Sequence, residues 1–67
     1  MVSSTVTHVF EERNHLLAEH AVLVWLQYEA LQKSPYRRMP VKDAEAYDRR
    51  RLRLGEVEKR LARFGPE

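Results

Sequence analysis

The chain has 67 residues, a mass of 8.0 kDa and no cysteine. This length allows one small domain over residues 1–67, whose core alone supplies roughly 3–5 kcal/mol of stability. The lack of cysteine excludes disulfides, thiolate zinc sites and cysteine-based catalysis. Hydrophobic residues make up 43% and charged residues 33%, which is too apolar for a disordered chain and too charged for a membrane span. We therefore expect a soluble cytoplasmic domain with no membrane association.

The formal net charge of +2 conceals two halves of opposite sign. Residues 1–32 carry one arginine against four glutamates, a net charge of −3, whereas residues 33–67 carry eleven Lys or Arg against six acidic residues, a net charge of +5. Such asymmetry is typical of a nucleic-acid-binding surface, and equally of two complementary helices in a hairpin.

Two segments free of helix breakers are separated by prolines. Ser34-Pro35 ends the first segment because proline disfavours helical geometry in the residue before it, and Pro40 suits the first turn of a new helix. Gly65-Pro66 ends the second segment. We expect a frayed segment over 1–5, a helix over about 6–33, a turn over 34–40 and a second helix over about 41–64.

Positions that are apolar, except for Asn14 and Arg50, recur with alternating spacings of three and four residues in both predicted helices. The members in the first helix are Phe10, Asn14, Leu17, Ala21, Val24, Tyr28 and Leu31. Those in the second helix are Tyr47, Arg50, Leu54, Val57, Leu61 and Phe64. The short turn makes the helices neighbours, so the pattern predicts an all-α, antiparallel, coiled-coil-like hairpin with these residues at its interface. A seam asparagine such as Asn14 commonly sets register.

The segment Ala21–Leu26 is apolar at six consecutive positions. At about 100° per residue these side chains surround the helix, and a helix that is hydrophobic all round must be buried. A single partner helix covers only one side, so we expect homodimerisation into a four-helix bundle. The predicted association residues are Val22, Leu23, Trp25 and Leu26. A groove for the helix of another protein would give the same pattern.

The sequence offers no constellation that favours enzymatic activity. Its serines lie in the N-terminal tail and the turn, and its two glycines form no phosphate-binding loop. We predict that the protein is not an enzyme and that it needs no cofactor.

One stripe of the first helix carries potential metal ligands. His8, Glu12, His15 and Glu19 fall on one side of a helix, and Glu12-Arg13-Asn14-His15 is a Glu-x-x-His pair. This pair resembles the Glu-x-x-His element of ferritin-like di-iron carboxylate proteins, which include short encapsulated ferritins that assemble their site between subunits. The resemblance implies a di-iron site with Glu12 and His15 as ligands, and Glu58 from the second helix lies at a suitable height. A solvated face with His–Glu pairs is the alternative, and our prediction is that no metal is bound.

The second helix carries a basic side. Arg49, Arg53, Arg60 and Arg63 share roughly one side of it, where they are candidates for phosphate contacts. The interspersed acidic residues also permit a solvated or salt-bridging face opposite the acidic first helix. The sequence thus predicts a small interaction or regulatory module that self-associates through its first helix. The alternatives are a nucleic-acid-binding regulator and a metal site between subunits.

Overall fold

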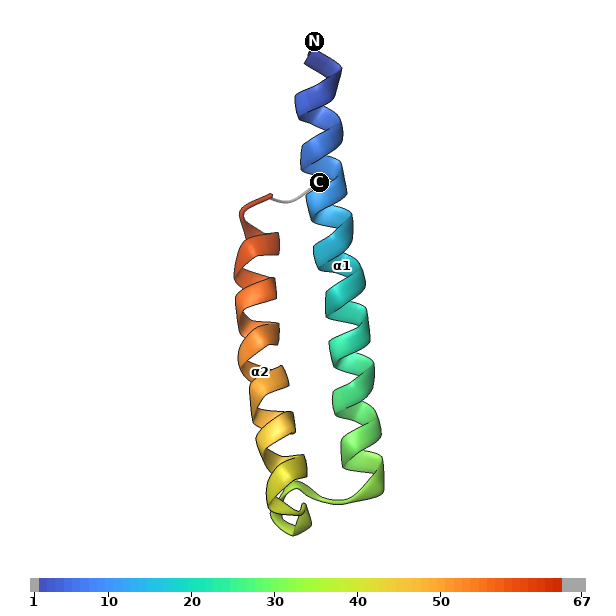
Figure 1. The fold of residues 1–67 in the computed structure, drawn as a ribbon, viewed down its shortest axis with the longest axis vertical. Helices are drawn as coiled ribbons and strands as arrows, with labels where there is room; N and C mark the ends of the chain where they lie inside the picture. The colour runs from blue at the N-terminus through green and yellow to red at the C-terminus, as the bar shows by residue number, and fades with distance from the viewer. Residues whose placement is uncertain (1, 65–67) are drawn as a thin grey trace.

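The computed structural model describes the backbone of residues 2–64 and the side chains of residues 9–64. Helix α1 (Val2–Lys33) is followed by a 3-10 turn η1 (Tyr36–Arg38) and by helix α2 (Val41–Ala62). The two helices pack side by side in opposite directions (Figure 1). Within residues 2–64 there is no β-strand. The expected all-helical hairpin is confirmed.

The helix ends follow from the two prolines. The N–H of Ser34 still donates to the carbonyl of Ala30 at 3.2 Å, and the chain then leaves helical geometry at Pro35. Pro40 is the N-cap of α2 and has an extended backbone, with φ −56° and ψ 155°. Its carbonyl accepts a hydrogen bond from the N–H of Ala44 at 2.9 Å. The sequence places these two boundaries correctly because proline acts locally.

The outer ends of the helices differ from the predicted ones. Helix α1 begins at Val2, earlier than residue 6, and residue 1 of the predicted frayed segment lies outside the described residues. Helix α2 ends at Ala62, two residues before the predicted end. There, the N–H groups of Arg63 and Phe64 donate three residues back at 3.1 Å, which tightens the last turn into 3-10 geometry. Gly65-Pro66, the predicted stop signal, lies outside the described residues.

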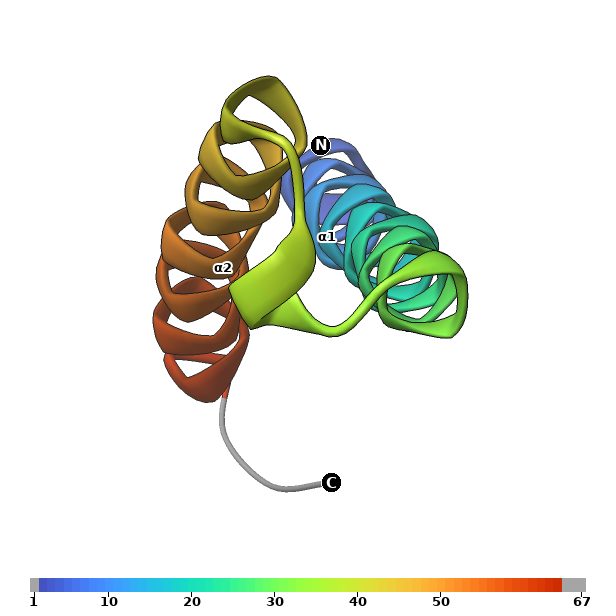
Figure 2. The same cartoon turned by 90° about the horizontal axis from the view of Figure 1, so that it is seen from below.

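The two helices are unequal in length. Helix α1 has 32 residues and α2 has 22. The N-terminal part of α1 therefore extends beyond the end of α2 (Figure 1). Viewed along its long axis, the molecule consists of one pair of helices closed at one end by the turn (Figure 2), and it measures 54 × 20 × 15 Å. Each helix therefore packs against the other along one side only, and its opposite side is not covered by the described part of the chain.

No helix within the described part of the chain has an apolar stretch long enough to traverse a bilayer.

The face that α2 turns toward α1 is the predicted one. Val57 is fully buried, and the other predicted positions on this helix are all half-buried. The half-buried members are Tyr47, Arg50, Leu54, Leu61 and Phe64.

The predicted seam on α1 is wrong. All of its members, from Phe10 to Leu31, are exposed. The residues of α1 that face α2 each lie one position before a residue of the predicted seam. Helix α1 is therefore rotated by about 100° about its axis relative to the predicted arrangement. Leu16 and Gln27 are the buried members of the face toward α2. The half-buried residues on this face are Arg13, His20, Leu23 and Ala30.

The rotation has a physical cause in the side chains of α2. Arg50 occupies the inner face of α2, and a guanidinium removed from water needs hydrogen-bond acceptors. The displaced face of α1 supplies Gln27 to Arg50, and the flank of that face supplies Glu19 to Arg53. The predicted seam from Phe10 to Leu31 offers only the Asn14 amide and the Tyr28 hydroxyl as side-chain acceptors, and it has no carboxylate.

Candidate association surface

A buried polar group joins the turn-proximal part of α1 to the middle of α2. Gln27 is only 8% exposed, its Oε1 accepts from Nε of Arg50 at 2.6 Å, and its Nε2 donates to the carbonyl of Tyr47 at 2.9 Å. The side-chain amide is therefore engaged through both its oxygen and its nitrogen. This arrangement fixes how α1 is rotated against α2, because turning α1 by one residue would separate the amide from Arg50.

A charged pair lies one to two turns further along. Arg53 donates from Nε to Oε2 of Glu19 at 2.6 Å and from Nη2 to Oε1 at 2.9 Å. It also donates from Nη1 to Glu56 at 3.4 Å. The hydrogen bonds from Arg53 lower the pKa of the Glu19 carboxyl below its usual 4.5, against a smaller opposing effect of desolvation. The same pairing raises the pKa of the Arg53 guanidinium, so both groups are charged at neutral pH.

One further polar contact joins the two helices toward the open end, and another joins the turn to α2. Nε2 of His20 lies 3.1 Å from Oε2 of Glu58, toward the open end. At the turn, the hydroxyl of Tyr36 donates to the Asp48 carboxylate at 2.9 and 3.0 Å, and this hydrogen bond raises the pKa of Tyr36 above 10.0. The rings of Tyr36 and Tyr47 lie 5.5 Å apart, tilted by 54°. The contact between the helices therefore combines these polar pairs with apolar packing, in which Leu16 and Val57 are the buried apolar residues among those described.

The apolar side chains of α1 lie mainly on its outer sides. Nine large hydrophobic residues between Val9 and Leu31 are exposed, and Phe10, Trp25 and Tyr28 each expose more than half of their surface. The full set on α1 is Val9, Phe10, Leu17, Val22, Val24, Trp25, Leu26, Tyr28 and Leu31. We call these residues the outer apolar surface of α1.

The predicted association residues fall on different sides of α1. Val22 and Trp25 are exposed at 57% and 59%, and Leu26 is exposed less strongly at 37%. Leu23 is half-buried on the face toward α2. Three of the four predicted residues therefore belong to the outer apolar surface, and Leu23 contributes to the hairpin itself.

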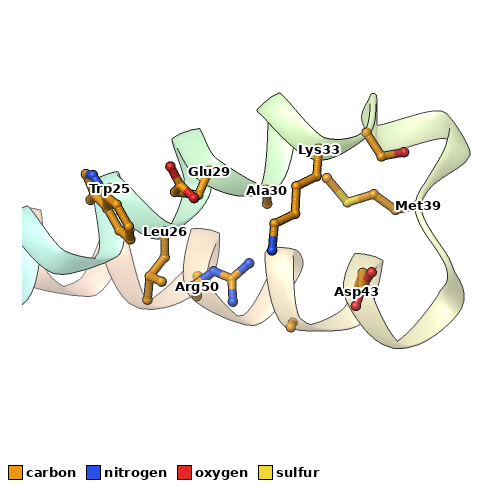
Figure 3. Close-up of a pocket in the computed structure, with 10 residues that line it drawn as sticks. Trp25, Leu26, Glu29, Ala30, Lys33, Met39, Asp43 and Arg50 are labelled. Atoms are coloured by element: carbon orange, nitrogen blue, oxygen red, sulfur yellow. The ribbon is translucent and has the colours of Figure 1, made fainter.

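Leu26 and Trp25 also border a groove of about 330 Å³ near the turn, between the end of α1 and the start of α2. Figure 3 shows Lys33 reaching from α1 toward α2 and Arg50 lying between the helices, with Glu29 and Asp43 at the rim. Two acidic and two basic side chains alternate with apolar ones around this groove. The acidic and basic side chains of this groove balance each other, and no set of hydrogen-bond donors converges on one point in it. We therefore assign the groove no ligand.

The candidate metal ligands do not converge. Glu12 and His15 are exposed on α1, and His15 lines a shallow depression with Glu11, Asn14 and Ala18. Glu58 contacts His20 and Glu19 contacts Arg53, so neither joins the predicted stripe. The His8 side chain lies outside the described residues. No group of three or more potential ligands occurs among the described residues.

The predicted phosphate-contacting arginines are only partly available. Arg49, Arg60 and Arg63 are exposed on α2. Arg53 is engaged by Glu19 and Glu56. Arg49 and Arg53 also border a broad, open depression on the outer side of α2, together with Arg51, Leu52, Gly55, Glu56 and Lys59.

Comparisons with known proteins give no further guide to function. No family model, curated protein or solved structure matches this chain. Function is therefore inferred from the geometry, in which the most extensive feature is the outer apolar surface of α1. Sequence reasoning missed that Phe10, Leu17, Val24 and Tyr28 belong to this surface, because their spacing fits a hairpin core equally well.

Proposed function

We propose that this chain is a non-enzymatic, cytoplasmic protein–protein interaction or regulatory module that self-associates through α1. In this proposal two hairpins combine into a four-helix bundle. The observation that carries the proposal is the outer apolar surface of α1, which includes Trp25 at 59% exposure and Tyr28 at 60%. Contiguous exposed apolar surface on a small domain marks an interaction site.

The amount of surface left exposed supports the proposal. The chain exposes 5787 Å² at a mass of 8.0 kDa. The surface relation for folded monomers gives about 4,450 Å² for this mass, so the excess is roughly 1,300 Å². A stable protein–protein interface removes about 800 Å² from each partner. Burial of α1 against a second hairpin would therefore remove more than half of this excess.

Sedimentation equilibrium of the full chain tests the proposal. We expect a dimer, and a shift toward monomer in Trp25→Asp because the substitution places a charge on the apolar surface. Leu52→Asp is the matched control, since Leu52 is 66% exposed on the outer side of α2. A monomeric wild-type chain at micromolar concentrations would contradict the proposal. Elemental analysis of the same sample tests the alternative of a metal site between subunits.

A second candidate function is nucleic-acid binding by α2. The observation that favours it is the exposure of Arg49, Arg60 and Arg63 along one side of this helix. Binding of this kind weakens steeply with salt, by a power that grows with the number of phosphates contacted. Fluorescence anisotropy with labelled duplex DNA and RNA separates this candidate from the interaction module. The measurement is made between 50 and 200 mM salt, and the double variant Arg49→Glu/Arg60→Glu is the comparison. A signal that is independent of salt and of both arginines rejects it.

A further inference from the structure

Five residues of the outer apolar surface of α1 form a heptad seam together with Asn14 and Ala21. Its residues run from Phe10 to Leu31 with spacings of 4, 3, 4, 3, 4 and 3. In heptad notation the step from a to d is three residues and the step from d to the next a is four. The d positions are therefore Phe10, Leu17, Val24 and Leu31, and the a positions are Asn14, Ala21 and Tyr28. We call these seven residues the outer seam, and all of them are exposed.

The outer seam is separate from the contact with α2. The residues facing α2 lie one position earlier, at Arg13, Leu16, His20, Leu23, Gln27 and Ala30, so the two faces are about 100° apart around α1. Contact with two neighbours at roughly this angle is what a helix in a four-helix bundle makes. Helix α1 thus has one face satisfied within the hairpin and a second face with the periodicity of a helix–helix contact.

We propose that the outer seam pairs with the outer seam of a second copy, with the two α1 helices parallel and in register. This inference rests on the proposed function and specifies the surface and orientation of the self-association. The excess exposed area of roughly 1,300 Å² per chain is sufficient for such an interface. The seam carries no charged residue, so two identical seams meet without like-charge repulsion.

Asn14 determines the orientation. A single asparagine at an a position with apolar d residues favours a parallel, in-register pair, because each amide then meets the same amide of the other helix. In an antiparallel pair, a positions face d positions, and Asn14 would lie against an apolar side chain such as Leu31 or Val24. The unpaired amide would lose its hydrogen bonds with water without replacement.

The half-buried side chains of α2 extend the same face. Leu54 and Leu61 lie about 40–60° around α2 from Val57, on the side where Glu58 contacts His20. His20 in turn lies between the inner face of α1 and the outer seam. The outer seam and the exposed edges of Leu54 and Leu61 therefore form one two-helix surface. Trp25, at an e position, borders the seam on its other side.

Matched substitutions locate the interface. Leu17→Lys replaces a seam residue, whereas Val22→Lys replaces an equally apolar residue about 120° from the seam axis. We expect Leu17→Lys to raise the dimer dissociation constant by roughly 100-fold or more, since both copies lose a buried leucine, and Val22→Lys to change it by less than about 5-fold. Sedimentation velocity over a dilution series measures both. The opposite order of effects would overturn the outer seam as the interface.

Single cysteines test the orientation, because the chain has no other thiol. In a parallel in-register pair, Leu31→Cys places two thiols within disulfide distance, with Cα atoms about 7 Å or less apart. In an antiparallel pair, the Cα atoms of the two Leu31→Cys residues lie more than about 20 Å apart. Crosslinking then requires a mixture of Tyr28→Cys chains with Phe10→Cys or Leu17→Cys chains, because a positions face d positions. Glu29→Cys, which lies off the seam, is the control for nonspecific oxidation.

The outcomes separate this inference from the proposed function. Rapid disulfide formation by Leu31→Cys alone, well above the Glu29→Cys control, supports the parallel seam. A dimer that crosslinks only in the mixed sample overturns the parallel orientation and leaves self-association intact. A wild-type chain that stays monomeric overturns both. Because crosslinking requires no disruptive charge, it also answers the question where Leu17→Lys fails to fold.

Discussion

Nε of Arg50 donates to Oε1 of Gln27 at 2.6 Å, which joins the inner faces of the two helices at a buried polar contact. Gln27 also donates to the carbonyl of Tyr47, so its loss removes the acceptor of the Arg50 guanidinium and a second hydrogen bond to α2. We expect the single changes Gln27→Leu and Arg50→Leu each to lower the free energy of unfolding by about 1–3 kcal/mol. Replacing both partners, as in Gln27→Leu/Arg50→Leu, removes the unsatisfied groups together and is expected to cost clearly less than the two single changes combined. Urea denaturation at one fixed protein concentration measures all four chains. Additive losses in the double variant would show that the two side chains do not act as a unit.

The Glu19–Arg53 pair makes stability depend on pH in the acidic range. Arg53 lowers the pKa of Glu19 in the folded chain, so ionised Glu19 favours the folded state above its unfolded pKa, and this contribution is lost as pH falls through the folded pKa. We expect Glu19→Gln to lower the melting temperature at pH 7 and the difference from wild type to shrink as pH falls below 4.5. Glu12→Gln is the control, because Glu12 is exposed on the same helix. A difference that persists unchanged at pH 2 would mean that packing, and not charge, accounts for the effect.

Most of the fold follows from local signals in the sequence. Pro35 and Pro40 set the inner helix boundaries within a few residues, and the short turn requires the helices to be neighbours. The inner face of α2 is equally predictable, because the strongly polar and charged side chains around Val57 leave only one apolar stripe. A single stripe determines the rotation of a helix.

The rotation of α1 is different, because its apolar residues surround the helix. Phe10, Leu17 and Val24 match the heptad period as well as Leu16 and Leu23 do, so periodicity alone permits two answers. The choice depends on Gln27 meeting Arg50 and on Glu19 meeting Arg53, which are 23 and 34 residues apart in the chain. Pairings at such separations leave no periodic signal in the sequence. The candidate association surface was predicted in part for the same reason: Val22, Trp25 and Leu26 are exposed, while Leu23 is taken up by the hairpin.

Gly55 offers a stabilising substitution. Helix α2 runs through this glycine without interruption, and a Cβ at position 55 would meet nothing within 4 Å. Because glycine in a helix interior costs about 0.5–1 kcal/mol relative to alanine, we expect Gly55→Ala to raise the free energy of unfolding by that amount. Thermal and urea unfolding measure it, with Ala62→Gly near the end of α2 as the inverse comparison. An unchanged or lower stability would indicate that α2 needs a flexible point at Gly55.

Adjacent leucines on α1 separate the stability of the hairpin from its association. Leu16 is 5% exposed against α2, whereas Leu17 is 43% exposed on the outer seam. We expect Leu16→Ala to lower the free energy of unfolding by about 2–3 kcal/mol at any protein concentration, because it leaves a cavity in the apolar packing between the helices. Leu17→Ala should act mainly on the dimer, so its effect on the melting temperature should appear at high protein concentration and fade on dilution. Circular dichroism melts over a hundredfold range of concentration measure both. Loss of stability from Leu17→Ala that is independent of concentration would place Leu17 in the hairpin core and would restore the rotation of α1 that its apolar spacing first predicts.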